Sequence, residues 1–501
     1  MRKRTTGQKL TDTFSLLKSG EMISVFSLFL LIILALPITV LLSLQTQNLK
    51  MHVAASGHIY YVSKNGNNAD GSSWQTAWNE LKNIHWSIVL PGDTILLDGG
   101  QTSMTYTTTL TIGKSGVSGL PITIARATDS GHNGKVVLFG GRSIPLPYCN
   151  QPNYTFQKRG VRSEGINMNS HSWITVDGMS WDGISIHGYN SGGIAIDTSS
   201  PNNTFRNIEA YDNGSAYKSG SAWSPAERGD AVKLYGGTNL TFQYMDLYDN
   251  SDDNFESDGP INNMSISYTW AHETREDPTQ PGTPWNQCVH QDGFQIYNGG
   301  DQGGILIQNS IFGPGLKEGT ILGNGPPANA QVNNVTIKNV LFTNKVINIM
   351  GRGTGAISNK KSNWNIDHVT VFGTDYGSVE VWLKGSGIYI NNSIFYGGHI
   401  WLRDGLTNSS NNCQWNTNAD TAKLPGQTVD PKFVTDVSGF TNATPLTTIA
   451  NANFALQSSS PCKGKGTSIT SIAQFLSMVN SQPFPERPER GLTVDHTTHF
   501  D

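Results

Sequence analysis

Between residues 174 and 395 the chain repeats a short stretch in which apolar and polar residues alternate. The clearest copies are residues 204–213, 241–250, 305–312, 335–342, 364–372 and 388–395, and residues 174–181 and 264–270 fit more loosely. Alternation with a period of two predicts β-strands, because successive side chains of a strand point to opposite faces. An Asn or Asp near the end of most copies is typical of a turn.

The copies recur at intervals of about 24 to 41 residues, which predicts a stacked array of coils. A propeller blade would need four strands in each repeat, and these short units hardly hold them. A leucine-rich solenoid would show a ladder of Leu residues, which the sequence lacks. We therefore predict an all-β fold, a right-handed parallel β-helix with aliphatic side chains stacked inside.

Two stretches flank the repeats. Residues 58–99 contain Tyr60-Tyr61-Val62-Ser63 and Pro91-Gly92-Asp93-Thr94-Ile95, and residues 430–461 begin with Asp430-Pro431-Lys432-Phe433. They resemble the opening and closing segments of secreted parallel β-helix proteins of the pectate-lyase type. The resemblance covers residues 58–465. It is specific for the fold and weak for the substrate, because this fold supports many activities.

An apolar run from Met22 to Leu44 is long enough to span a bilayer. The basic residues before it predict a cytoplasmic N-terminus with the rest of the chain outside. We expect an uncleaved anchor in the cell membrane; the alternative is secretion after signal cleavage near Val53-Ala54-Ala55. The predicted organisation is a cytoplasmic segment (1–21), a transmembrane helix (22–44), a linker (45–57), the β-helix domain (58–465) and a C-terminal tail (466–501).

The composition narrows the functional class. Charged residues make up 14% of the chain and the net charge is −4, which argues against nucleic-acid binding. The four cysteines, Cys149, Cys288, Cys413 and Cys462, form no CxxC pair, so a zinc site is not expected. Outside the cytoplasm Cys413 and Cys462 are the favoured disulfide, and unpaired buried thiols are the alternative. We expect a monomer.

Four acidic residues each open a short apolar strand in four successive repeats: Asp230, Asp253, Asp292 and Glu318. In a parallel β-helix they stack in one column, because neighbouring strands lie about 4.8 Å apart. Carboxylates at that spacing repel one another unless a cation, a shared proton or a basic substrate offsets the charge. This column is the predicted functional site.

Two long loops, residues 214–229 and 272–291, lead into acidic strands. We expect both loops to rise beside the column and to form the wall of a cleft. Aromatic rings next to polar groups suit a sugar, which presents both C–H faces and hydroxyls. The predicted substrate-binding residues, on these loops and along the groove, are Trp223, Arg228, Trp285, Gln295, Glu318 and Arg352.

The densest part of the column is Asp252-Asp253 with Glu256, and Asp230 lies one coil earlier. This group resembles the calcium site of family 9 polysaccharide lyases. The resemblance implies Ca²⁺ ligands at Asp230, Asp252, Asp253 and Glu256, and hard carboxylate oxygens suit Ca²⁺. The ion would neutralise a uronate carboxylate and acidify the neighbouring C5 proton, which favours β-elimination.

The chain departs from that family at the catalytic base. The family places a Lys two residues after a Gly, and here Gln295, which cannot take a proton, occupies that position after Gly293. We expect His290 to act as the base, because imidazole titrates near neutral pH, and Lys317 is the second candidate. Lys233 is also within reach; the pKa of either lysine would have to be lowered for it to act as a base, and the acids around both would raise it instead.

The sequence thus predicts a polysaccharide lyase that cleaves an acidic polysaccharide outside the cytoplasm. One alternative is a glycoside hydrolase on the same scaffold, with Asp253 and Asp292 as its carboxylate pair. Asp292 is therefore a predicted catalytic residue beside His290 and Lys317. The other alternative is a non-catalytic β-helix for glycan binding or adhesion.

Overall fold

The computed structural model describes residues 57–155, 163–273, 275–296, 302–321, 332–344, 347–350, 362–373, 379–382, 386–397, 409–417 and 424–466. The predicted transmembrane helix at 22–44 and most of the predicted tail lie outside these residues. Within the described ranges, no helix has the length and apolar character needed to cross a membrane.

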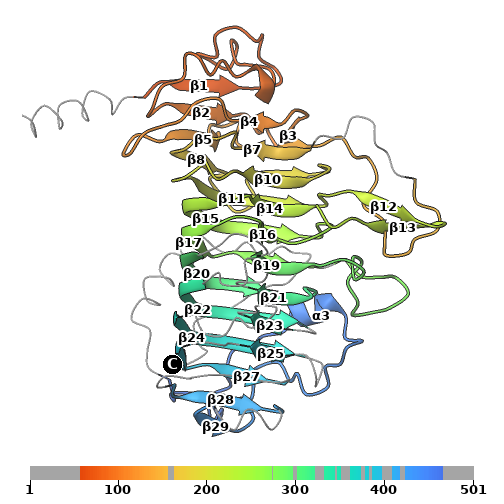
Figure 1. Cartoon of the computed structure of the whole chain (residues 1–501). Coiled ribbons are helices and arrows are strands. Elements are labelled where there is room, and N and C mark those ends of the chain that lie inside the picture. The colour runs from red at the N-terminus through yellow and green to blue at the C-terminus, as the bar shows by residue number, and fades with distance from the viewer. Residues whose placement is uncertain are drawn as a thin grey trace, which may run out of the picture. The chain divides into compact units, whose positions relative to one another are not determined.

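Successive coils of the chain stack on one another and form two sheets of parallel strands (Figure 1). Among the described residues the long sheet has 18 strands and the short sheet has nine. The helices are short: η1 (Leu81–Asn83) is a 3₁₀ turn and α3 (Leu446–Ala450) has five residues. The predicted all-β parallel β-helix is confirmed.

The short sheet holds the strands that carry the acidic residues. Its members are β4 (Leu110–Thr111), β7 (Glu164–Asn167), β10 (Gly192–Ile196), β14 (Asp230–Leu234), β16 (Phe255–Ser257), β19 (Asp292–Ile296), β21 (Glu318–Ile321), β23 (Ile347–Met350) and β25 (Val379–Trp382).

The long sheet forms the remaining sides of the coils. Its members are β1 (Ile59–Val62), β2 (Thr94–Leu97), β3 (Ser103–Tyr106), β5 (Ile122–Arg126), β6 (Lys135–Phe139), β8 (Ile174–Asp177), β9 (Ile184–His187), β11 (Thr204–Tyr211), β15 (Gly237–Tyr248), β17 (Ile261–Ser267), β18 (Trp270–His272), β20 (Gln302–Phe312), β22 (Val332–Asn344), β24 (Ser362–Gly373), β26 (Ser386–Asn391), β27 (Ile394–Tyr396), β28 (Asn412–Trp415) and β29 (Gly426–Thr428).

Equivalent apolar side chains of successive coils lie directly above one another in the core. One register column runs through Ile124, Val176, Phe205, Phe242, Ile266, Ile307, Ile337, Ile366 and Ile390. All nine side chains are fully buried. The rings of Phe205 and Phe242 stack with their centroids 5.4 Å apart. Period-two alternation therefore places one set of side chains in a continuous core.

Asparagines join the coils at the turns. Asn202, Asn239 and Asn263 all have positive φ, a conformation that Asn tolerates better than most residues. Asn239 Nδ2 donates to Asn202 Oδ1 at 2.8 Å, and Asn263 Nδ2 donates to Asn239 Oδ1 at 2.6 Å. These asparagines, which precede the alternating copies, thus form a ladder of side-chain hydrogen bonds across three neighbouring coils.

The segment 424–466 packs on an outer face of the long sheet. Phe433 and Phe454 of this segment contact Tyr396 and Phe372 of the sheet, with ring centroids 5.9 and 5.1 Å apart. The favoured disulfide Cys413–Cys462 is present and ties the segment to β28.

A second disulfide joins Cys149 to Cys288, so all four cysteines are paired. The alternative of unpaired buried thiols is wrong. Disulfides form and persist in oxidising compartments, and the two bonds indicate an extracytoplasmic domain.

The edge-to-face packing of aromatic rings in the core predicts a large loss of stability for Phe255→Ala. Phe255 is fully buried between Phe242 and Phe294, with ring centroids 5.3 and 5.9 Å away. Loss of the ring leaves a cavity that costs about 3–5 kcal/mol of unfolding free energy. Denaturant unfolding of the purified protein measures this change. Tyr217→Ala, at a side chain that is 46% exposed, is the control; equal midpoints for the two variants would contradict the buried stack.

Candidate functional site

The acidic residues occupy one column of the short sheet. Gly192 of β10 pairs in register with Glu164 on one side and Asp230 on the other, and Asp292 pairs with Glu318. Between these pairs, the Asp253 N–H donates to Asp230 Oδ1 at 3.2 Å and the Asp292 N–H donates to Asp253 Oδ1 at 2.7 Å. The four acids named from the sequence thus lie on neighbouring coils, three of them at the first residue of a strand and Asp253 just before β16.

The carboxyl groups of this column are deeply buried. Asp230, Asp253 and Asp292 are at most 1% exposed and Asp252 is 6% exposed. Burial, together with the charges of neighbouring acids, raises the pKa of Asp230 and Asp253 well above the ordinary value. Burial, and next the charges of Glu256 and Asp292, raise the pKa of Asp252 to about 9. The cluster therefore tends either to retain protons or to bind a cation.

Lys233 is the resident cation of the cluster. Its Nζ lies 2.9 Å from Asp258 Oδ2 and 3.6 Å from Asp230 Oδ2, and it donates a hydrogen bond to Glu256. Burial lowers the pKa of Lys233, but the charges of Asp230 and Glu256 outweigh that effect and raise it above the ordinary value. A lysine held protonated in this way cannot serve as a base at neutral pH.

Several carboxylate oxygens in the column remain available to a ligand. Asp252 Oδ1, Asp253 Oδ2 and both oxygens of Asp292 are buried and accept no hydrogen bond within the described part of the chain. One oxygen each from Asp230, Asp253 and Glu256 lie within 4.8 Å of one another. Hard oxygen donors in this number fit Ca²⁺, which takes six to eight oxygen ligands.

His290 lies beside Asp292 of the column. Its side chain is 43% exposed, and its Nδ1 lies 3.5 Å from Asp292 Oδ2. The Gln295 amide Nε2 lies 3.4 Å from the same Nδ1. Lys317 is exposed, and its backbone N–H donates to Gln291 O at 2.7 Å. Of the three predicted catalytic residues, Asp292 is thus the first residue of β19, His290 lies two residues before it, and Lys317 precedes the neighbouring strand β21.

Two further acidic residues of this cluster were not predicted from the sequence. Glu164 continues the column beyond Gly192, and Asp258 holds Lys233. Glu164-Gly165-Ile166 has the same order of acid, glycine and apolar residue as Asp292-Gly293-Phe294, and that repetition could have revealed it. Asp258 carries no comparable signal, because it follows its strand rather than opening it.

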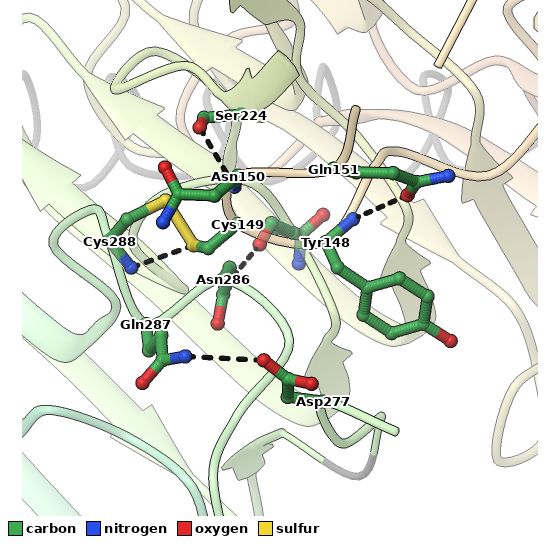
Figure 2. Close-up of a disulfide and its surroundings, with 10 residues drawn as sticks. Tyr148, Cys149, Asn150, Gln151, Ser224, Asp277, Asn286, Gln287 and Cys288 are labelled. Atoms are coloured by element: carbon green, nitrogen blue, oxygen red, sulfur yellow. Dashed lines mark hydrogen bonds between the residues drawn. A yellow bond between two sulfur atoms is a disulfide. The ribbon is translucent and has the colours of Figure 1, made fainter. Parts of the chain in front are cut away.

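Three loops, not two, form the wall beside the column. The two predicted loops are joined by residues 140–155, which precede the short-sheet strand β7. The disulfide Cys149–Cys288 ties this third loop to the second (Figure 2). The first loop contains the antiparallel hairpin of β12 (Ala216–Ser219) and β13 (Ala222–Pro225), and Gln151 and Trp223 exchange two backbone hydrogen bonds of 2.8 Å. The wall is therefore cross-linked.

The predicted substrate-binding residues of the wall occupy different positions. Trp285 is fully buried, its Nε1 donates to Glu273 Oε2 at 3.1 Å, and Arg275 lies 4.3 Å over its ring. Its indole therefore contributes to loop packing. Trp223 is half-buried and packs edge-on against Tyr154 at 5.8 Å.

The remaining predicted contacts lie along the groove or beyond the described part of the chain. Arg228 is exposed and lines a pocket next to Asp230, and Gln295 is buried beside His290. Glu318 has a described backbone position on β21, next to Asp292. Arg352 lies outside the described residues.

The cross-linked wall predicts a local effect of Cys288→Ser. Removal of the Cys149–Cys288 bond frees the loop that ends at His290, and a cross-link of this kind contributes about 2–4 kcal/mol. Amide hydrogen exchange of residues 273–291 should accelerate, while exchange of the short-sheet strands stays unchanged. Cys413→Ser breaks the other disulfide and is the control. Equal exchange in the loop of both variants would show that the wall does not depend on the bond.

The buried acids predict a pH dependence of stability in the presence of a chelator. Asp252 keeps its proton up to about pH 9 in the folded protein, whereas an unfolded Asp loses it near pH 4. The folded state binds more protons between these limits, so stability falls as pH rises from about 5 to about 8. Asp252→Asn should flatten this slope in urea unfolding, and Asp129→Asn in an exposed loop should not. An unchanged slope in Asp252→Asn would refute the assignment.

Comparisons with known proteins give matches at the level of structure. No protein-family model matches the chain, and no curated protein matches its sequence. The pectate lyase Pel9A is 17% identical, with 82% of this chain and 92% of that chain covered and a TM-score of 0.40. A rhamnogalacturonan lyase is 15% identical (80% and 97% covered, TM-score 0.47), and XylC in complex with xylose is 10% identical (76% and 88% covered, TM-score 0.42). Their activities are properties of those proteins.

Proposed function

We propose that this protein is an extracytoplasmic polysaccharide lyase that cleaves an acidic glycan by Ca²⁺-assisted β-elimination. The observation that supports the proposal is the column of buried carboxylates, in which Asp252 Oδ1, Asp253 Oδ2 and both oxygens of Asp292 accept no hydrogen bond among the described residues. Burying charge without a partner is costly, so such a cluster favours a cation. A cation at that place attracts an anionic substrate.

The proposed Ca²⁺ ligands are Asp230, Asp252, Asp253 and Glu256. Asp230, Asp253 and Glu256 supply the close oxygens, and Asp252 adds a buried oxygen that accepts no hydrogen bond in the described residues. Bound there, the ion supplies charge neutralisation for a uronate carboxylate and acidifies the adjacent C5 proton. Lys233 holds two of the same carboxylates and therefore competes with the ion for them.

The proposed base is His290. Imidazole has the intrinsic pKa closest to neutral pH, and a base must accept a proton at the working pH. Asp292, 3.5 Å from Nδ1, holds the ring and stabilises the imidazolium that forms when Nε2 takes the C5 proton. Lys317, whose exposed side chain lies just before β21, is the second candidate.

A glycoside hydrolase is the second candidate function, favoured by the pairing of Asp253 and Asp292. The Asp292 N–H donates to Asp253 Oδ1 at 2.7 Å, so the two residues are adjacent in the column. Retaining glycosidases use a pair of neighbouring carboxyl groups. Burial raises the pKa of Asp253, which suits a general acid. A β-helix that only binds glycans would cleave none.

The lyase proposal predicts release of unsaturated, ultraviolet-absorbing product from an acidic polysaccharide. Pectate, alginate and neutral glycans are assayed with Ca²⁺ and with a chelator. Asp253→Ala should lower the rate by roughly 100-fold or more, because it removes a ligand and an electrostatic group. Asp129→Ala, in an exposed loop, should leave the rate unchanged.

The other outcomes identify the alternatives. New reducing ends without ultraviolet absorbance, resistant to chelator, would identify a hydrolase. Glycan binding with no cleavage would identify a binding module. Full activity in Asp253→Ala would remove the column from the active site.

A further inference from the structure

A pocket lies beside the acidic cluster, over β10. It has a volume of about 360 Å³, which is at the small end of the range for ligand pockets. Its lining comes from the short sheet, from the base of the β12–β13 hairpin and from the segment after β16. Asp230 and Lys233 belong to both the pocket and the acidic cluster.

The pocket exists because β10 carries small residues where its neighbours carry large ones. Gly192 stands in register between Glu164 and Asp230, and Ala195 stands between Asn167 and Lys233. The large residues of β10, Ile194 and Ile196, are part of the core. The strands on either side of β10 are about 10 Å apart, twice the strand spacing. The notch between them can therefore admit one sugar ring.

Gly192 cannot be replaced without disturbance. A Cβ at this position would lie 2.8 Å from the backbone oxygen of Asp230. The absence of a side chain is thus required by the close approach of the two strands, and it also keeps the floor of the notch open.

Of the two basic side chains that line the pocket, one is available to bind an anionic ligand. Lys233 is bound by Asp230, Glu256 and Asp258. Arg228 is exposed, and no ion pair holds it within the described part of the chain. A guanidinium offers a planar pair of donors that matches a carboxylate.

The remaining walls suit a sugar ring. The ring of Tyr235 is 50% exposed and presents an apolar face at the edge of the pocket. Burial raises the pKa of Glu164, which lines the same pocket. Ser191 adds a hydroxyl.

We propose that this pocket is the binding site for a single uronate residue, with its carboxylate on Arg228 and its ring against Tyr235. The assignment rests on the proposed function, because it places one residue of an acidic glycan next to the carboxylate cluster. The glycosidic bond to be cleaved then follows this residue toward Asp253 and Asp292, and the pocket sets the register of the substrate.

The test is a binding measurement with monosaccharides, which contain no bond to cleave. Galacturonate, glucuronate, mannuronate and guluronate are titrated against the full protein, each beside its neutral hexose, by ligand-observed NMR. At least one uronate should bind about tenfold more tightly than its neutral counterpart, the size expected for one charge-assisted pair. Arg228→Gln should abolish this preference.

Two variants sharpen the result. Lys218→Gln removes the same charge from the same hairpin outside the pocket and should keep the preference. Ala195→Met fills the notch and should weaken the binding of both sugars. Arg228 and Lys218 are exposed, so both charge variants should fold.

The experiments can refute the proposed uronate pocket and the proposed lyase activity independently. A preference for uronates that persists in Arg228→Gln, or the absence of any uronate binding, would overturn the pocket even if the protein cleaves pectate or alginate. Conversely, an Arg228-dependent preference without cleavage of any polysaccharide would support the pocket and defeat the lyase.

Discussion

In-register pairing of parallel strands is the constraint on which the rest of this structure depends. Each coil repeats the path of the coil before it, so equivalent residues stack at the strand spacing of about 4.8 Å. In the core this produces columns such as the one through Phe205 and Phe242. At the turns it produces the asparagine ladders of Asn202, Asn239 and Asn263. Apolar and amide side chains gain from self-stacking, and they stabilise the winding.

The same constraint turns unfavourable when the stacked residue is an acid. Asp230, Asp253 and Asp292 lie on consecutive coils and are buried, so their charges repel one another in a medium that screens poorly. Backbone N–H donors relieve part of the repulsion, and Lys233 relieves more of it at one end. Several carboxylate oxygens of the column accept no hydrogen bond from the described residues. This distinguishes the column from the asparagine ladders, whose side chains bond to one another, and makes it a candidate binding site.

The loops that leave the stack complete the site. A solenoid is regular, so specificity for a ligand has to come from departures from the repeat. Here these are a strand with small residues, β10, and long insertions such as residues 273–291. The insertions here are joined by Cys149–Cys288 and by the pairing of Gln151 with Trp223. The wall beside the acids is thereby stiffened across segments far apart in the sequence.

The coil architecture and the stacking of the four acids could be predicted from the sequence, because both follow from local periodicity and from the recurrence of the repeats. Cys413–Cys462 was one of the pairings open to the sequence, and the folded chain selects it. Other features depend on contacts between distant segments. Cys149 and Cys288 are 139 residues apart in loops without a repeat, and no local pattern relates them. Trp285 faces into its loop, and Lys233 turns toward Asp258, because side-chain packing and charge balance depend on neighbours brought in by other coils. Strand position is a property of the repeat, whereas burial and ion pairing are properties of the assembled stack.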